Sequence, residues 1–277
     1  MKVCLGTLLA IGLSLGSAAA GSSTMPLAPH RVVYDLSLLS SSSSRGVEAA
    51  RGRVAFSFTG NSCEGYALTY RQVTVLEGGD IGQRTSDLRT TTFEDGKGAS
   101  FTFKTESTFS GAPSKLVDGQ AERGTGDSLV VRTRAPRRDH FSLDGDVLFP
   151  TEHLKRIIAA AKAGERLVEA RVFDGSDDGR QIYDTLAIIG RQRGADSVDG
   201  LEEAARQEAL RNVPRWPVKI SYFTREGEGE RTPRYQLSFE LYENGISRDL
   251  VLDYGDFSLK GEMKKLEMLE THPCDTP

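Results

Sequence analysis

The sequence predicts a mainly β protein, in which a long antiparallel meander forms a β-spiral or open barrel with one inserted helix. Three observations support this fold class: alternating apolar and polar residues recur along the chain, turn residues separate these runs, and one segment, at about 151–163, has helical spacing. A dozen or more short strands exceed what one flat sheet holds before it curls. We therefore expect a partly closed barrel with the helix against its inner face.

The hairpin predicted from Gly52 to Leu76 is the most clearly patterned part of the chain. Both halves alternate with the period of a strand that buries one face. The connection from Gly60 to Gly65 contains the glycines and the asparagine that turns require, and it places Cys63 at the tip of the hairpin. The apolar positions are Val54, Phe56 and Phe58, followed by Tyr66, Leu68 and Tyr70.

The N-terminus predicts export. Lys2 is followed by an apolar stretch from Val3 to Leu15 and by small residues from Ser17 to Ala20, the order found in a secretory signal peptide. We expect a signal peptide at 1–20 that is cleaved near Ala20, a flexible N-terminus at 21–28, and a location in the periplasm. The apolar stretch is too short for a membrane span, and we expect no transmembrane segment in the mature chain.

Charge and length narrow the class of protein further. Without residues 1–20 the chain keeps 34 basic and 39 acidic residues, a net charge of −5 with both signs interspersed. This balance disfavours nucleic acid as a partner. Because single β-sandwiches and barrels commonly reach this length, we expect one domain over 29–277.

Two cysteines remain in the mature chain, Cys63 and Cys274, because Cys4 lies in the signal peptide. In an exported protein this count favours one disulfide, which would enclose nearly the whole domain. Two alternatives stay open at this point: a pair of free thiols, or a catalytic cysteine. No CxxC motif supports either alternative.

Further strands are predicted before the helix. The segment 30–39 alternates loosely and is followed by a serine run, Ser40 to Ser44, which we expect to be a solvated loop. Turns with Asp-Gly or Gly-Thr-Gly then separate strand-like runs, as in an antiparallel meander. These runs are 83–93, 99–109, 115–123 and 128–134.

The best helix signal follows Phe149 and Pro150. Its apolar residues recur at i, i+3, i+4 and i+7, Thr151 is placed to cap the start, and Gly164 suits the position after the end. The apolar stripe should pack on the sheet. It consists of Leu154, Ile157, Ile158 and Ala161.

The meander resumes after the helix. Strands are predicted at 166–173 and 181–190, a second short helix at about 201–211, and three more strands from Val218 onward. Asn244-Gly245 is a strong hairpin signal, and a last strand over 257–269 leads to the final cysteine. Trp216 is expected in the core, because large aromatic residues are highly buried on average, although an exposed contact is the alternative.

No motif indicates a metal or a catalytic centre. The run from Asp174 to Gly179 matches the first half of a calcium loop, but Thr185 stands where the bidentate glutamate belongs, so we expect a hairpin turn. Beyond the expected signal peptide at 1–20, the GxSxG, HExxH, SxxK and P-loop patterns do not occur. We expect no enzyme activity, no cofactor and no metal. The scattered histidines are His30, His140, His153 and His272.

A local basic cluster surrounds Pro136. It could meet an anionic headgroup or an acidic partner, but a solvated strand end and turn is the favoured interpretation. The cluster consists of Arg132, Arg134, Arg137 and Arg138.

Several motifs taken together resemble the alphaproteobacterial cell envelope integrity protein B family, long filed as a domain of unknown function. The resemblance covers about 28–274, and the motifs are specific in combination. They are Ala28-Pro29-His30-Arg31 with Tyr34, the hairpin from Gly52 to Gly65, Phe149-Pro150-Thr151-Glu152-His153-Leu154, the run from Val172 to Gly179, Tyr183-Asp184-Thr185, the run from Ser238 to Gly245, and Cys274.

The resemblance implies a periplasmic, non-enzymatic protein whose long β-spiral is similar in shape to the periplasmic lipoprotein carriers. It implies a disulfide between Cys63 and Cys274, in agreement with the count of cysteines. The serine run is the place where departure from the family pattern is expected. The family supplies no catalytic residues to carry over.

Three functions follow in order of preference. The first is a binding or scaffold protein that supports the cell envelope through a protein partner, for example a periplasmic tetratricopeptide-repeat protein, or through a lipid. The second is a lipid or lipoprotein carrier with an acyl-binding groove beneath the helix, and the third is an envelope hydrolase. The residues expected to line the groove or to contact the partner are Leu154, Ile157, Ile158 and Trp216.

Overall fold

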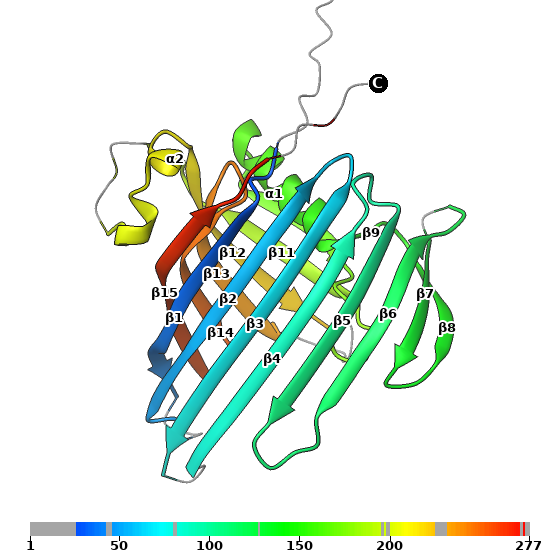
Figure 1. The fold of residues 1–277 in the computed structure, drawn as a ribbon, viewed down its shortest axis with the longest axis horizontal. Helices are drawn as coiled ribbons and strands as arrows, with labels where there is room; N and C mark the ends of the chain where they lie inside the picture. The colour runs from blue at the N-terminus through cyan, green and yellow to red at the C-terminus, as the bar shows by residue number, and fades with distance from the viewer. Residues whose placement is uncertain are drawn as a thin grey trace, which may run out of the picture.

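One sheet of 15 strands makes up most of the fold and curls into a nearly closed, barrel-like shape (Figure 1). The computed structural model describes residues 26–42, 46–79, 82–126, 128–194, 197, 200–224, 232–271 and 274. The expected fold class is therefore confirmed. The signal peptide expected at 1–20 lies outside the described residues.

The strands follow one another along the chain with short connections. The first eight are β1 (His30–Ser41), β2 (Ala49–Asn61), β3 (Gly65–Gly78), β4 (Gly82–Glu94), β5 (Ser100–Phe109), β6 (Lys115–Arg123), β7 (Ser128–Ala135) and β8 (Asp139–Asp144). The others are β9 (Val147–Leu148), β10 (Leu167–Val172), β11 (Tyr183–Ile189), β12 (Arg215–Phe223), β13 (Tyr235–Tyr242), β14 (Ser247–Asp253) and β15 (Phe257–Met268).

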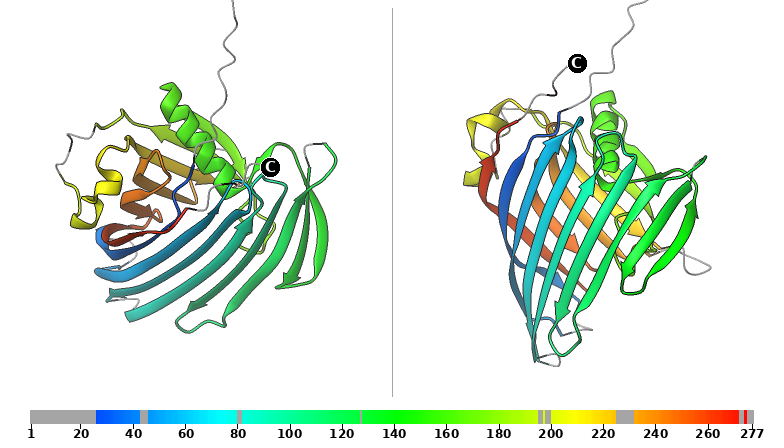
Figure 2. Two further views of the ribbon diagram at one scale, coloured as in Figure 1. Left: turned by 45° about the horizontal axis from the view of Figure 1, so that its top comes forward. Right: turned by 45° about the vertical axis from the view of Figure 1, so that its right-hand side comes forward.

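The first and last strands of the chain pair with each other in the middle of the sheet. Strand β1 pairs with β2 on one side and with β15 on the other, so the sheet order is β8 to β1 followed by β15 to β9. The described strand pairs are antiparallel except β9 with β10. We call β1–β6 the first wall and β10–β13 the second wall; the two face each other in Figure 2.

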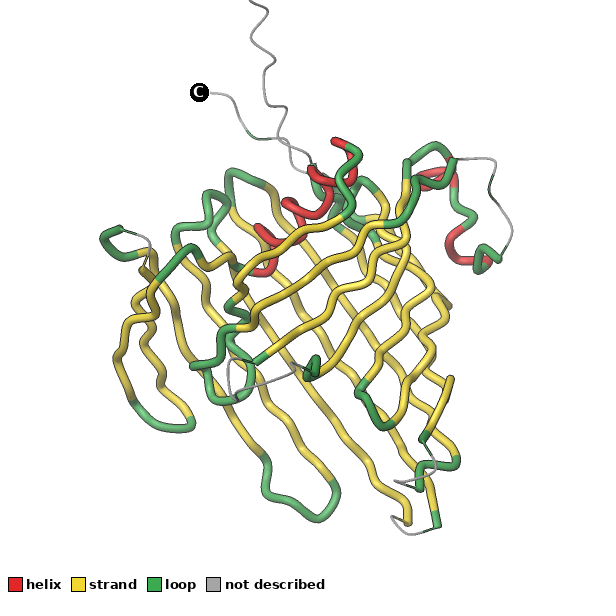
Figure 3. Tube along the Cα trace, turned by 180° about the vertical axis from the view of Figure 1, so that it is seen from behind, coloured by secondary structure: helices red, strands yellow, loops and turns green. Residues whose placement is uncertain are grey.

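The helix α1 (Pro150–Ala163) lies between the two walls at one end of the sheet (Figures 2 and 3). Its buried apolar residues belong to a hydrophobic cluster that also includes Phe58 and Tyr66 of the first wall and Val168 and Ala187 of the second. The predicted helix and its position against the inner face are therefore confirmed. Among the described residues no helix combines the length and the hydrophobicity needed to span a membrane.

The predicted second helix at 201–211 is two shorter turns, the 3₁₀ turn η1 (Glu203–Ala205) and α2 (Glu208–Arg211). Gln207 separates them, because its backbone is extended with ψ of 149°. This segment lies beside β15 where β14 no longer pairs with it. Gln207 Nε2 donates to the carbonyl oxygen of Leu266 at 2.8 Å, and the Met263 N–H donates to Glu202 at 3.4 Å.

Two further expectations need correction. Ser40 and Ser41 are not loop residues but end β1, where the Ser40 hydroxyl lies 2.6 Å from that of Ser258; the serines at 43–44 lie outside the described residues. The expected flexible segment 21–28 is held in place at 26–28. Leu27 is buried, and the Ala28 N–H donates to the Asn244 carbonyl oxygen at 2.9 Å.

The strands β8 and β9 were not expected. The arginines that precede β8 were interpreted as a solvated strand end and turn, which fits their observed environment: Arg132 and Arg134 are exposed on β7 and pair with Glu122 and Asp118. The alternation in β8 is hidden because its residues are mostly polar. β9 has only two residues and cannot be recognised from periodicity.

Candidate functional site

Several of the motifs that suggested the family lie around α1, although they are far apart in the sequence: Thr185 and Glu243 each contact an α1 side chain, as does Tyr66 directly after the hairpin motif. We call this region the helix end; it comprises α1, the β2–β3 turn at 61–65, the β4–β5 turn at 95–99, and the β13–β14 turn at 243–246. We take it as the candidate functional site, because α1 here joins the two walls.

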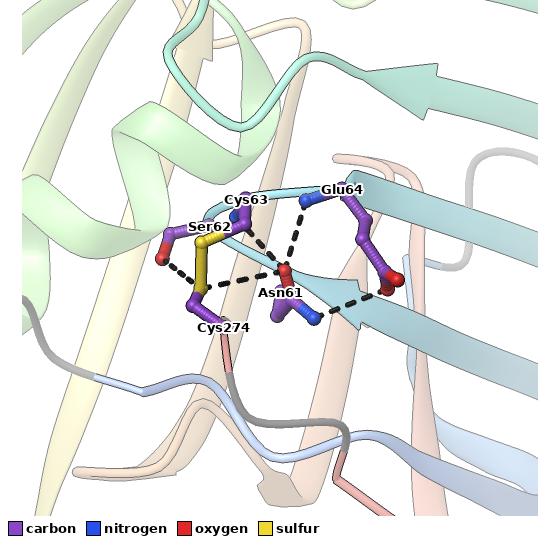
Figure 4. The surroundings of a disulfide bond; sticks show 5 residues. All are labelled: Asn61, Ser62, Cys63, Glu64 and Cys274. Carbon is purple, nitrogen blue, oxygen red and sulfur yellow. Dashed lines mark hydrogen bonds between the residues drawn. A yellow bond between two sulfur atoms is a disulfide. The ribbon is translucent and has the colours of Figure 1, made fainter. Parts of the chain in front are cut away.

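A disulfide between Cys63 and Cys274 ties the C-terminal tail to the β2–β3 turn (Figure 4). Their α-carbons lie 5.8 Å apart, and 211 positions separate them in the sequence. The turn holds Cys63 in place, because the side-chain oxygen of Asn61 accepts hydrogen bonds from the backbone N–H groups of Cys63 and Glu64 at 2.8 and 2.9 Å. The disulfide expected from the cysteine count is present.

The start of α1 is capped by a strand residue. Glu94, the last residue of β4, accepts hydrogen bonds from the N–H groups of Thr151 and Glu152 at 2.8 and 3.0 Å. The Glu152 carboxylate in turn accepts from the Phe149 N–H at 2.9 Å. The expected Thr151 cap is therefore wrong, because the helix begins one residue earlier, at Pro150, which suits the first helical position.

Burial raises the pKa of Glu94 from 4.5 to about 7, and the neighbouring Glu152 carboxylate adds to this shift. The two N–H donors act in the opposite direction, since they favour the ionised form. Glu94 is only 3% exposed. A carboxyl group that titrates near neutral pH thus holds the end of α1 against the first wall.

Arg123, the last residue of β6, connects three elements at the helix end. Its guanidinium donates to the carbonyl oxygens of Gly98 and Val147 at 3.1 and 2.8 Å, and to Glu152 at 2.7 Å. It also lies 5.1 Å from the centre of the Phe149 ring. One side chain therefore fixes the β4–β5 turn, β9 and α1 relative to one another.

Polar side chains of α1 also contact β11 and the β13–β14 turn. His153 Nε2 lies 3.3 Å from the hydroxyl of Thr185 on β11, and that hydroxyl donates to the Ala170 carbonyl oxygen at 3.0 Å. Lys162 pairs with Glu243 at 2.5 Å. Burial, together with the charge of nearby Arg156, lowers the pKa of His153 to about 4, so this imidazole is neutral at neutral pH.

The residues expected to line a groove are brought together, but they form part of the core. Ile157 and Ile158 have no exposed surface, and Trp216 is 4% exposed. Leu154 is partly buried against the same cluster. Three of the four side chains are thus buried in the core and do not line an open groove in this structure. The preferred core interpretation of Trp216 is confirmed.

The loop from Asp174 to Gly179 lies inside the connection between β10 and β11, which pair as a hairpin. Gly175 has φ of +70° and packs so closely on Phe103 that an added β-carbon would lie 2.3 Å from the ring. Among the described residues, no group of three or more histidine, cysteine, aspartate or glutamate side chains is arranged to hold a metal ion. The loop packs on the first half of the sheet.

Three tyrosines line the inner side of the second wall beyond the core. Tyr222 and Tyr235 stack with ring centres 4.3 Å apart, and Tyr183 meets each of them edge-on at 5.8 Å. The Tyr183 hydroxyl donates to Asp177 at 2.6 Å. Burial raises the pKa of the Tyr183 hydroxyl, so this group stays protonated and acts as a hydrogen-bond donor. Burial also raises the pKa of the nearby Asp174 carboxyl group.

Open space adjoins the helix end in two places. A cleft of about 570 Å³ lies beside the disulfide and is lined by Pro29, Glu64, Leu269 and Phe93, of which Phe93 is 43% exposed. A second cleft of about 590 Å³ extends from β10, at the edge of the second wall, across β11 to Phe223 of β12. Both clefts are open to solvent and are large enough for side chains of a partner.

Sequence reasoning missed Glu94 and Arg123. Both occupy inward positions of their strands, since Thr92 and Ala121 precede them by two residues and direct neighbours on a strand point to opposite faces. A charged residue at an inward position near the end of a strand was the available signal. What could not be derived was that both side chains reach α1, which lies about 30 to 60 positions later in the sequence.

Comparisons with known proteins agree on one family. The sequence profile described as EipB-like matches residues 21–270. The cell envelope integrity protein EipB of Brucella abortus (strain 2308) is 34% identical over 256 residues, which cover 92% of this chain and 89% of that protein. The crystal structure of a β-barrel-like protein of the domain of unknown function DUF1849 from Brucella abortus superimposes with a TM-score of 0.80 at 33% identity, covering 89% of this chain and 100% of the other.

Proposed function

The chain belongs to the EipB-like family, and on this basis we propose that it is an exported, non-catalytic binding or scaffold protein that supports the integrity of the cell envelope from the periplasm. The name of the Brucella relative supports the envelope role. The signal-peptide pattern at 1–20 and the disulfide support export into an oxidising compartment.

The proposal of a scaffold rests on the polar side chains of the helix end, which are hydrogen-bonded within the protein. The side chains of Glu94 and Arg123 make their hydrogen bonds to α1 and its neighbours. His153 is neutral, and the hydroxyl beside it donates to a backbone carbonyl oxygen. Such an arrangement fixes a surface, whereas an activated nucleophile needs a base that accepts its proton.

The same packing favours a protein partner over an acyl chain. An acyl carrier needs apolar space beneath α1, but Ile157, Ile158 and Trp216 fill that region and pack on each other. The described clefts instead lie outside the core and are lined by both charged and apolar residues. We therefore place the partner, which we take to be a protein of the envelope such as a tetratricopeptide-repeat protein, at the rim and outer surface.

Survival of the source bacterium in detergent after deletion of the gene tests this function. We expect deletion to sensitise the cells and the full-length gene to restore survival. A gene lacking codons 2–20 is the matched control for export, and it should produce the protein without restoring survival. Full restoration by this leaderless form would contradict a periplasmic role, and unchanged survival after deletion would contradict an envelope role.

A further inference from the structure

Strand β10 presents a free edge at one end of the sheet. Its inner neighbour β11 pairs with all six of its residues, but β9 pairs only with Arg171 and Val172. Along the remaining residues, 167–170, no described strand lies on the outer side. The edge is therefore about 13 Å long at the usual rise of a strand.

The direction of the backbone groups along this edge follows from the pairing. The Ile189 N–H donates to the Arg166 carbonyl oxygen at 2.8 Å, which makes these two residues a hydrogen-bonded pair of the β10–β11 ladder. Backbone groups in an antiparallel ladder alternate in direction. Val168 and Ala170 therefore bond to β11, while the N–H and C=O groups of Leu167 and Glu169 point to the free edge, where no described residue bonds to them.

The cleft of about 590 Å³ reaches this edge at Glu169 and Ala170 and extends from there across β11 to Phe223 of β12. Arg156 of α1 and Asp146 just before β9 also line it. An edge strand with unpaired backbone groups is the geometry in which an extended peptide adds to a sheet as a further strand. Unpaired edge groups are a template for such pairing.

The side chains along the edge define what would bind. Leu167 is 58% exposed, and its cross-strand neighbour Ile188 on the same face is 48% exposed. Glu169 is exposed two residues further along that face. A strand added here would place an apolar side chain over Leu167 and Ile188 and a basic side chain opposite Glu169.

We propose that residues 167–170 of β10 bind an extended segment of a partner protein as an added β-strand, with a basic and an apolar residue two positions apart on one face. A second copy of this chain is a poorer fit. Two-fold antiparallel pairing of this edge opposes Glu169 with Leu167 or with the other Glu169, and neither supplies the positive charge. The proposal rests on the proposed function in that the partner is a protein.

A proline at position 169 tests the edge with little effect on the fold. The Glu169 N–H is not used within the sheet, and proline is tolerated on an edge strand whose N–H faces solvent. Glu169→Pro should therefore melt close to wild type while blocking strand addition. Leu167→Asp is the second variant, since it removes the apolar contact at an exposed position and leaves the backbone unchanged.

The probe is a phage-displayed library of random seven-residue peptides, selected on the full-length mature protein. We expect enriched peptides with a basic residue two positions from an apolar one, and binding weaker by about tenfold or more to Glu169→Pro and to Leu167→Asp, since each change removes at least about 1.4 kcal/mol of binding free energy. Amide hydrogen exchange should slow at Leu167 and Glu169 when the peptide binds.

Three outcomes would overturn the proposal: no enrichment, equal binding to all three proteins, or protection confined to another segment. A concentration-dependent dimer that Glu169→Pro abolishes would also overturn it, in favour of self-association. None of these outcomes affects detergent survival, so failure here is distinguishable from failure of the proposed function.

Discussion

The Glu94 carboxylate accepts a hydrogen bond from the Thr151 N–H at 2.8 Å, although the two residues lie 57 positions apart. A side chain from the sheet therefore supplies the cap that α1 lacks locally. Because burial raises the pKa of Glu94 to about 7, this contact links the attachment of α1 to pH.

We expect Glu94 to make the protein less stable as the pH rises from about 4.5 to 7. The folded-state pKa lies above the ordinary value of 4.5, so the stabilising contribution of the protonated group is complete below about pH 4.5 and is lost as the pH rises through about 7. The Glu94→Gln variant stays neutral. Its melting temperature should rise relative to wild type between pH 5 and pH 8.

Glu122→Gln is the control for this experiment, because Glu122 forms an exposed ion pair with Arg132 on the outer face of the sheet. Its melting temperature should keep a nearly constant offset from wild type over the same range. A constant offset for Glu94→Gln as well would show that Glu94 titrates as an ordinary carboxyl group.

Replacing Cys63 and Cys274 together by serine should lower the melting temperature under oxidising conditions. Loss of a native disulfide costs about 2–5 kcal/mol, here because the unfolded chain loses a constraint between residues 211 positions apart. In the presence of a reductant, wild type and variant should melt together. Equal melting without reductant would contradict the stabilising role of the bond.

Arg123→Met should destabilise the protein by about 2–3 kcal/mol, because it removes the guanidinium that donates to the carbonyl oxygens of Gly98 and Val147 and leaves the Glu152 carboxylate with only the Phe149 N–H as a donor. Urea unfolding gives the free energy directly. Arg132→Met removes an arginine of the same kind at an exposed pair and should change stability by less than about 0.5 kcal/mol. Equal effects of the two variants would argue against a special role of Arg123.

Glu240 holds a buried charge network on the outer face, which also contacts the described residues 193–194, 197, 200 and 202. Its carboxylate pairs with Arg215 at 3.0 Å, with Arg193 at 2.7 Å, and with Arg248, whose guanidinium also pairs with Glu202. We expect Glu240→Gln to cost about 3–5 kcal/mol in urea unfolding, because two buried guanidinium groups lose a counter-charge.

Asp35→Asn tests the same change at the exposed Asp35–Arg53 pair and should be close to neutral. A Glu240 variant as stable as wild type would mean that the attraction between these charges only balances the cost of burying them. A much larger loss of stability for Glu240→Gln than for Asp35→Asn would show that the buried charge network stabilises the fold, unlike an exposed ion pair.

The predictable part of the fold came from local patterns. The hairpin around Cys63, the helix that ends just before Gly164 and the Asn244-Gly245 turn follow from period-2 alternation, period-3.6 spacing and turn residues within a few positions of each other. The disulfide was predictable for another reason: only two cysteines, Cys63 and Cys274, lie outside the expected signal peptide.

The candidate site was only partly predictable, because its contacts are distant in sequence. Neither Glu94 nor Arg123 carries a local signal of the helix that it holds. Likewise, the pattern at 201–211 suggested a single helix, but the segment forms two short turns separated by Gln207, whose side chain donates to the Leu266 carbonyl oxygen of β15. The position of this segment depends on where β14 stops pairing with β15, and the sequence pattern does not reveal this.

Whether the protein supports the envelope by binding or by chemistry is tested most directly in cells that lack the gene and carry the double variant His153→Gln, Thr185→Val. This variant removes the one imidazole of the helix end and the hydroxyl beside it, with nearly the same side-chain volumes. If the protein is a scaffold, detergent survival should equal that of wild type at equal levels of folded protein. A folded variant that fails to restore survival would contradict the scaffold function and point to a reaction at this pair.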